Sequence, residues 1–135
     1  MSAETQSARS WTVELPAGLE LLSMNGRENR WVRNRKVQAL KDATIVMVRH
    51  AKVPGLQRIQ IAVYYDPPNR RRRDHDNLMA TYKPLADGIV KAGVVPDDNT
   101  VYVVPPHCEV TGTIVPLGRI RIVITEVRAR GGDAG

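Results

Sequence analysis

Two pairs of closely spaced aspartates are the residues of this chain whose types and spacing could do chemistry. Asp74 and Asp76 are two positions apart, and an extended backbone would turn both side chains to one face. Asp97 and Asp98 form a second pair, which an intervening helix would bring back toward the first. Converging carboxylates repel each other, and a hard divalent cation that takes oxygen ligands removes the repulsion. The pattern therefore predicts a site for Mg²⁺ or Mn²⁺, which would activate water and stabilise charge developing on a phosphate.

Cationic side chains lie next to the first aspartate pair. Four consecutive arginines lead directly into it: Arg70, Arg71, Arg72 and Arg73. Each guanidinium can bind a phosphate through two hydrogen bonds, and Lys83 could bind a phosphate or assist proton transfer. A phosphodiester substrate would explain both signs of charge in one site. Two structural interpretations stay open, because a D-x-D is often a solvated turn or helix cap and the arginines could simply neutralise the carboxylates.

The composition indicates a basic globular protein. The chain has 135 residues and a formal net charge of +6, which suits a polyanionic partner, although a basic surface kept for solubility would give the same charge. Aromatic residues make up only 4%, which argues against a protein that binds single strands by stacking bases on several rings. Cys108 is the single cysteine, so an intrachain disulfide and a cysteine-based zinc site are excluded.

Length and hydropathy predict one cytoplasmic domain. The chain is long enough for one hydrophobic core and too short for two. No stretch approaches the ~18 apolar residues of a membrane helix, and MSAETQSARSWTVEL at the N-terminus lacks the apolar run of a signal peptide. We expect a folded domain over residues 11–127, a disordered tail at 1–10, a flexible tail at 128–135, and no membrane partner.

A first helix is predicted between Arg27 and about Arg49, the longest segment without proline or glycine. Most of its basic residues, Arg30 and Arg33 among them, fall off the apolar stripe. We interpret this basic face either as a solvated surface or as a surface for phosphates. The stripe recurs at helical spacing and consists of Val37, Leu40, Thr44 and Met47.

A second helix is predicted from an apolar stripe with the same period. Pro84 lies within it, and proline suits only the first turn of a helix. We therefore expect a short turn capped by Asn77, then the main helix from about Lys83, with Gly93 just beyond its C-terminal end. The stripe consists of Leu78, Tyr82, Leu85 and Ile89.

Alternating apolar and polar residues predict strands at Trp11–Leu15, Leu56–Tyr65 and Gly118–Val127. We expect three further extended segments, at Leu19–Met24, Thr100–Val104 and Cys108–Val115. The strands are grouped and do not alternate regularly with the helices. This grouping favours an α+β fold with a mixed or antiparallel sheet and two main helices.

The run R-R-R-D-H-D-N, followed by K-P-L-A-D-G-I-V-K-A-G-V-V-P-D-D, resembles the RusA family of Holliday junction resolvases, which is common in phages and prophages. In that family an R-D-x-D-N motif precedes a helix with K-x-x-x-D, and a glycine turn and a D-D pair follow. Lys83 and Asp87 match the second of these motifs. Five residues separate Asn77 from Lys83, a longer spacing than in the family members, where a gapless alignment would put Ala80 at the lysine position.

The resemblance implies an α+β homodimer that resolves four-way DNA junctions in recombination and repair, encoded by a bacterium, phage or prophage. It implies Mg²⁺ held by Asp74, Asp76 and Asp98, with Asp97 able to share the site, and Lys83 as a catalytic residue. Metal-activated water would attack a phosphodiester and leave a 5′-phosphate at each of two symmetric nicks, with no small-molecule cofactor. DNA would be contacted by Arg70, Arg71, Arg72, Arg73, Lys83, Arg30 and Arg33.

Two other functions remain open. A non-catalytic module of the same fold would bind junctions without cutting them. A metal-dependent phosphotransferase or nucleotide hydrolase could use the same pair of aspartates, but the sequence contains no glycine-rich phosphate loop of the Walker type.

Overall fold

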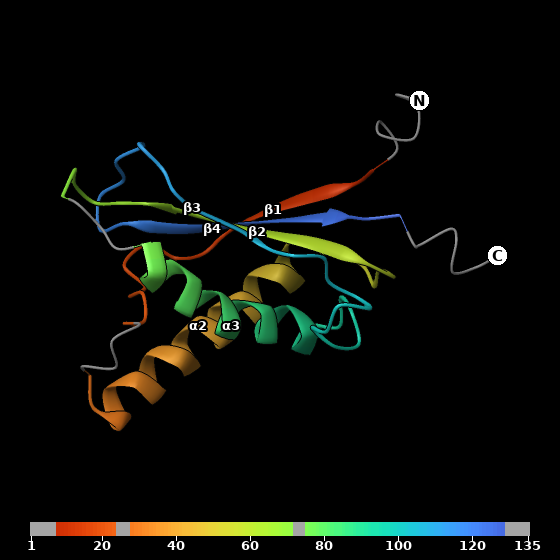
Figure 1. Cartoon of the computed structure of the whole chain (residues 1–135), viewed down its shortest axis with the longest axis horizontal. Helices are drawn as coiled ribbons and strands as arrows, with labels where there is room; N and C mark the ends of the chain where they lie inside the picture. Colours follow the sequence, from red (N-terminus) through yellow and green to blue (C-terminus); the bar gives the residue numbers. More distant parts are fainter. Residues whose placement is uncertain (1–7, 24–27, 72–74, 129–135) are drawn as a thin grey trace.

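The protein is an α+β structure in which two helices cover one face of a four-stranded sheet (Figure 1). The computed structural model describes residues 8–23, 28–71 and 75–128, and residues 75 and 76 by their backbone alone. The elements in chain order are β1 (Ser10–Glu14), α2 (Arg30–His50), β2 (Ile59–Asp66), α3 (His75–Lys91), β3 (His107–Val110) and β4 (Arg119–Glu126). Among the described residues, no helix combines the length and the apolar character needed to cross a membrane.

The sheet is mixed, as the sequence predicts. Its strand order is β1-β4-β2-β3, with β4 antiparallel to both β1 and β2, and β3 parallel to β2. Two parallel neighbours need a long crossover, and α3 forms part of the connection from β2 to β3. This connection places α3 against the sheet and fixes the end of the sheet from which the helix starts.

The core lies between the sheet and the helices because alternate side chains of the two long strands point to the same face. Ile122 of β4 pairs with Val13 on one side and Val63 on the other, so three strands contribute to one buried row. The helices close this layer with their apolar stripes. The fully buried core side chains include Ile59, Ile61, Val63, Ile120, Ile122 and Ile124 of the sheet, and Leu40, Val48, Leu78, Leu85 and Ile89 of the helices.

Three segments predicted as extended differ in the structure. Residues 19–23 form no strand, because the Leu22 N–H donates to the Thr81 hydroxyl of α3 and not to a neighbouring strand. Residues 100–104 form a turn with a single bridge from Val103 to Ile59. The third segment is a strand only as far as Val110, since the chain then turns and directs a threonine side chain back to the end of β2.

The second helix is continuous through Pro84, so the predicted break before Lys83 is wrong. Proline inside a helix removes one hydrogen bond and costs roughly 3 kcal/mol. Here fully buried side chains lie on both sides of it, with Leu78 before and Leu85 and Ile89 after. Helices in proteins are held mainly by such packing, which offsets the cost. The helix therefore starts at His75, and Asn77 lies inside it and not at its cap.

A glycine sets the distance between the two helices. A Cβ atom added to Gly88 of α3 would lie 2.7 Å from Cβ and 2.9 Å from Cγ2 of Thr44 on α2. Thr44 is itself fully buried, and its hydroxyl donates to the Leu40 carbonyl one turn earlier. The two helices are therefore in close contact at this point, with no room for a side chain at position 88.

We expect Gly88→Ala to lower the free energy of unfolding by about 1–2 kcal/mol, because overpacking at Thr44 outweighs the gain in helix propensity. Urea denaturation followed by circular dichroism measures the difference. Gly112→Ala is the matched control, since an added Cβ there meets nothing within 4 Å. Equal stability of the two variants would show that the helices have room to separate.

Candidate functional site

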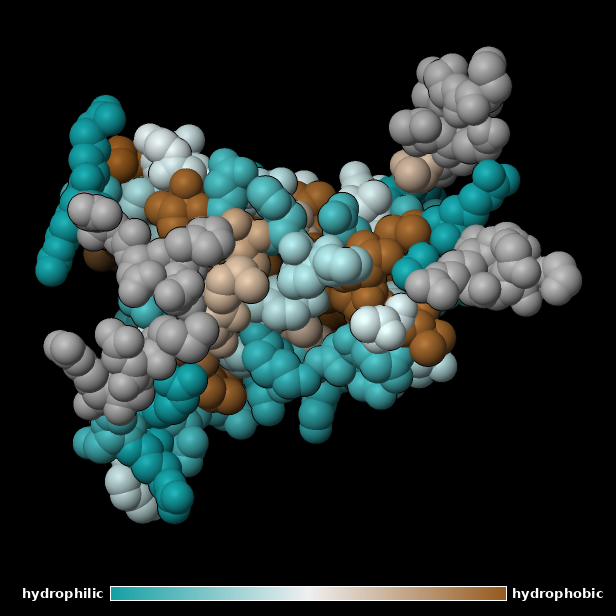
Figure 2. Space-filling view, in the orientation of Figure 1, coloured by the Kyte–Doolittle hydropathy of each residue, from teal (hydrophilic) through white to brown (hydrophobic). Residues whose placement is uncertain are grey.

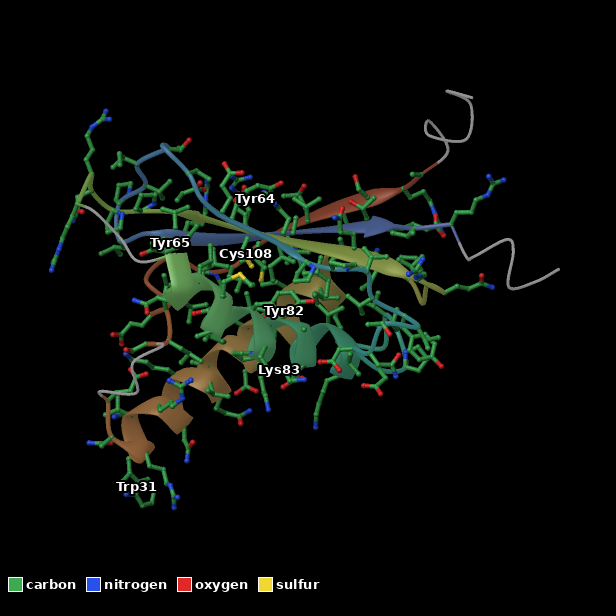
Figure 3. The ribbon with its side chains drawn as sticks, in the orientation of Figure 1. Trp31, Tyr64, Tyr65, Tyr82, Lys83 and Cys108 are labelled. Carbon is green, nitrogen blue, oxygen red and sulfur yellow. The ribbon has the colours of Figure 1, made fainter. Side chains whose placement is uncertain are left out.

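Lys83 gathers two carboxylates around its ammonium group. Its Nζ donates to Asp98 Oδ2 at 2.5 Å and lies 3.2 Å from Asp87 Oδ1 one turn further along α3. Lys83 lies on the side of α3 turned away from the sheet, whereas Tyr82 and Cys108 lie between the helix and the sheet (Figure 3). The structure thus brings together Lys83 and Asp98, two of the predicted site residues, and adds Asp87 from the same motif.

Asp98 reaches Lys83 because α3 ends in a tight glycine turn. Gly93 has a φ of +92°, the left-handed conformation that favours glycine just after a helix, as the sequence predicts. Its N–H donates to Val90 O and the next N–H donates to Ile89 O, the pair of bonds that closes a Schellman motif. Val94 and Val95 are then buried. The chain therefore returns along α3 and presents the second aspartate pair to it.

The two members of that pair point to different partners. Asp97 Oδ1 accepts from the Asp98 N–H, and Asp97 Oδ2 accepts from the Asn99 side chain, so Asp97 fixes the loop. Asp98 directs its carboxylate to Lys83. The two charges stabilise each other: the hydrogen bond from Lys83 lowers the pKa of Asp98, and the bond to Asp98 raises the pKa of Lys83 above its ordinary value. Lys83 is therefore a cation at neutral pH.

The first aspartate pair is only partly within the described residues. Asp74 lies outside them, and Asp76 is described by its backbone alone, in the first turn of α3. The extended backbone expected from Asp74 to Asp76 is therefore wrong from His75 onward, and helical positions two apart do not share a face. Positions 76, 83 and 87 instead follow one stripe of α3. Lys83 is seven positions after Asp76 in this helix, a rise of about 10 Å.

A groove of about 160 Å³ runs between α2 and α3 beside this stripe. Three cations border it: Arg33 and Lys41 from α2, and Lys83 from α3. Its lining is completed by Asp87 and by the apolar residues Leu22, Val37, Ala80 and Pro84. Each of these cations is paired with a carboxylate: Arg33 with Glu28, Lys41 with Asp87, and Lys83 with both Asp87 and Asp98. A phosphate group could bind in the groove by taking the place of one of these carboxylates.

Of the other predicted DNA-binding residues, only Arg33 borders this groove, where hydrogen bonds to the Ser23 carbonyl and to Glu28 hold it. Arg30 is exposed at the first residue of α2 and does not line the groove. Arg70 and Arg71 are exposed on the loop that follows β2 and line a second hollow. Arg72 and Arg73 lie outside the described residues.

A buried carboxylate that the sequence does not single out lies at the end of β2, where the loop with Arg70 and Arg71 begins. Asp66, the last residue of β2, is fully buried. It accepts two hydrogen bonds from Arg119, two from Arg121 and one from the Thr111 hydroxyl, at 2.6–3.2 Å. Asp66 belongs to β2, both arginines belong to β4, and Thr111 follows β3. The carboxylate therefore joins three segments of the chain.

Hydrogen bonding to Arg121, and then to Thr111 and Arg119, holds the pKa of Asp66 well below its usual range despite its burial. A signal for this cluster exists in the sequence. Arg119 and Arg121 alternate with isoleucines in β4, so an acidic partner on the next strand would complete a cross-strand pair. The register, which sequence patterning does not give, places Asp66 opposite Arg119.

The described part of the chain contains no group of three histidine, cysteine or acidic side chains that could hold a metal ion. Two of the predicted ligands, Asp74 and the side chain of Asp76, are outside that part. The described residues do place two carboxylates around the Lys83 ammonium group. Asp87 and Asp98 direct carboxylate oxygens toward one positive charge, which is the donor type that Mg²⁺ prefers.

Comparison with known proteins gives partial similarity to a nuclease. The chain is 28% identical over 129 residues to an uncharacterised protein of Xylella fastidiosa, covering 92% of this chain and 82% of that protein. It is 38% identical over 72 residues to the crossover junction endodeoxyribonuclease rusA of Enterobacteria phage HK97, covering 53% of this chain and 55% of the phage protein. No family model matches the chain. The similarity to the nuclease thus spans about half the length of each protein.

We expect Asp66→Asn to lower the free energy of unfolding by about 3 kcal/mol at pH 7, because two guanidinium groups would lose their buried counter-charge. Urea denaturation measures the loss. Asp42→Asn is the matched control, since Asp42 is exposed on α2 and accepts one hydrogen bond from Gln38. A cost at Asp66 no larger than at Asp42 would show that the cluster contributes nothing net to stability.

The same carboxylate should make stability depend on acid pH. Its pKa is lower in the folded than in the unfolded protein, so its contribution is complete above the unfolded value of about 4 and is lost as the pH falls below it. We expect the stability difference between wild type and Asp66→Asn to be constant from about pH 7 to 5 and to shrink below about pH 4. A difference that widens in acid would contradict the assigned pKa shift.

Proposed function

We propose that this protein is a Mg²⁺-dependent endonuclease that cuts branched DNA at four-way junctions, a member of the RusA family that acts in recombination and repair. The observation that carries the proposal is the cluster of Lys83, Asp87 and Asp98 at the end of a cationic groove. The similarity to the phage rusA nuclease supports it. The proposed location is the cytoplasm of a bacterial cell.

In this proposal Asp74, Asp76 and Asp98 hold the metal ion, with Asp97 beside them. Of these residues, Asp98 has its carboxylate next to a positive charge in the structure, that of Lys83, which supports its role as a ligand of a cation. Bound Mg²⁺ would lower the pKa of a water molecule and offset the charge that develops on the phosphate. Mn²⁺, which has the same preference for oxygen ligands, is the alternative.

Lys83 acts as a cation in this proposal and not as a general base. Its two carboxylate neighbours raise its pKa, so it keeps its proton at neutral pH. Its side chain is 65% exposed, which leaves it able to turn from Asp98 to a phosphate oxygen when DNA enters the groove. The ammonium group could then orient the phosphodiester or donate a proton to the departing oxygen.

The cations along the groove and on the loop after β2 would hold the DNA backbone. Arg33 and Lys41 border the groove, and Arg70 and Arg71 extend from the loop. Contacts of this kind depend on the shape of the DNA more than on its sequence and weaken as salt rises. A homodimer would place two such sites on one junction and give paired nicks.

We expect the wild-type protein to nick a labelled four-way junction only when Mg²⁺ is present, and to leave a linear duplex of the same sequence intact. Asp76→Asn and Asp98→Asn should each lower the cleavage rate by about 100-fold or more while junction binding persists, because they remove charge stabilisation at the phosphate and not the cationic surface. Gel electrophoresis of the labelled products and a filter-binding assay measure the two properties.

Asp42→Asn serves as the carboxylate control and should cut like the wild type. Asp98→Asn should also keep its thermal midpoint, since an exposed ion pair contributes little to stability. Tight junction binding by the wild type without any cutting under Mg²⁺ or Mn²⁺ would instead identify a non-catalytic junction-binding module. Loss of folding in both aspartate variants would make these residues structural.

A further inference from the structure

A second hollow, separate from the groove beside Lys83, lies at the end of the sheet where β2 leaves it. Its volume is about 250 Å³. The loop after β2 forms one wall, and the segment between β3 and β4 forms the other; the two lie side by side in Figure 1. Apolar side chains show between hydrophilic ones at this end of the molecule (Figure 2). The lining residues are Pro67, Asn69, Arg70, Arg71, Val110, Thr111, Gly112 and Ile114.

The chemistry of this hollow is apolar inside and cationic at its rim. Pro67, Val110 and Ile114 supply carbon surface, and the exposed Arg70 and Arg71 supply positive charge. Asp66 immediately precedes Pro67 in the chain, but its carboxylate is fully buried and is bonded to the guanidinium groups of Arg119 and Arg121. Its negative charge is therefore offset by Arg119 and Arg121, so Asp66 does not neutralise the positive charge of Arg70 at the rim.

We propose that this hollow receives one unpaired base of the DNA while Arg70 and Arg71 hold the adjoining phosphate; the inference rests on the proposed function. A nucleotide combines a flat, weakly polar ring with an anion, which is the combination the hollow offers. Unpaired bases are bound in proteins by stacking on apolar, aromatic or guanidinium surfaces. The volume is below the 300–1,000 Å³ of sites for drug-sized ligands, so it suits one base and not a longer segment.

The position of the hollow ties it to the proposed cleavage site. Asp76 is five positions after Arg71, so their Cα atoms lie no more than about 18 Å apart. A base in the hollow would thus belong to a nucleotide close to the phosphate that is cut. Extruding a base costs least where pairing is already interrupted, as at the branch point of a junction. The hollow would therefore select branched DNA over duplex.

Gly112 gives a way to fill the hollow without removing charge. A Cβ atom added there meets nothing within 4 Å, and its φ lies outside the left-handed region, so a larger side chain can be built without strain in the fold. Gly112→Phe should occupy the space meant for the base. Gly112→Ala adds little volume and is the matched control. Unchanged thermal midpoints for both variants would verify folding.

The test uses a four-way junction with 2-aminopurine at the branch point, in EDTA so that no cutting occurs. We expect wild type and Gly112→Ala to increase the 2-aminopurine fluorescence as the base unstacks from its neighbours, and Gly112→Phe to lose the increase and to bind the junction about 10-fold more weakly. A linear duplex carrying the same probe should show no increase. Equal fluorescence and affinity for Gly112→Phe and wild type would overturn the proposal.

Arg70→Lys tests the contact with the adjoining phosphate. Lysine keeps the charge but lacks the guanidinium fork that binds a phosphate through two hydrogen bonds, so junction binding should weaken while the salt dependence of binding stays unchanged. Junction affinity equal to that of the wild type would contradict the assignment of Arg70 to the phosphate.

One further experiment distinguishes an error in the proposed nuclease function from an error in the proposed base-binding site. A deoxydinucleotide titrated into the protein, followed by NMR, should shift the amide signals of Gly112 and Ile114 in the wild type, and should leave the Ile114 signal unshifted in the Gly112→Phe variant. If the dinucleotide produces these shifts but junctions are neither bound nor cut, the base site stands and the nuclease proposal falls. If junctions are cut but the amide signals do not shift, the base-binding site is refuted and the nuclease proposal stands.

Discussion

The buried carboxylate of Asp66 is the interaction on which the functional end of the molecule depends. A carboxylate without access to water is costly unless its oxygens are fully bonded, and here five hydrogen bonds from Arg119, Arg121 and Thr111 meet that requirement. These partners come from β4 and from the turn after β3. The loop that carries Arg70 therefore leaves the sheet from a fixed point, and both walls of the second hollow are tied to the same carboxylate.

Helix α3 carries the other half of the site. Its close approach to α2 at Gly88 and Thr44 keeps Lys41 within 3.9 Å of Asp87, so the groove between the helices is narrow and charged. The glycine turn at its end then returns the chain along the helix. One rigid element thus holds Lys83 and Asp87 at fixed spacing, and the return of the chain supplies Asp98.

The sequence predicts well what depends on local patterning and poorly what depends on distant contacts. The alternation in β2 and β4 and the left-handed glycine after α3 are local features, and they are confirmed. The break at Pro84 was predicted from local chemistry and is wrong, because burial on both sides holds the helix together. Asp66 and its arginines are 53 and 55 residues apart, and only the strand register brings them together. The sequence predicts that the second aspartate pair returns toward the first, but the ion pair of Lys83 with Asp98 and the groove between the helices depend on how distant segments pack.

The two kinds of carboxylate in this fold divide the work between stability and chemistry. Asp66 is fully buried, so its charge is fixed by its partners and cannot serve a ligand. The side chain of Asp98 is 24% exposed and that of its partner Lys83 is 65% exposed. Separating this ion pair in water therefore costs little free energy. In the proposed function an incoming phosphate would pair with the ammonium group, and a metal ion would bind the carboxylate, without loss of the fold. A site that exchanges its counter-ions in this way is better built from weak surface pairs than from a strong buried cluster such as that of Asp66.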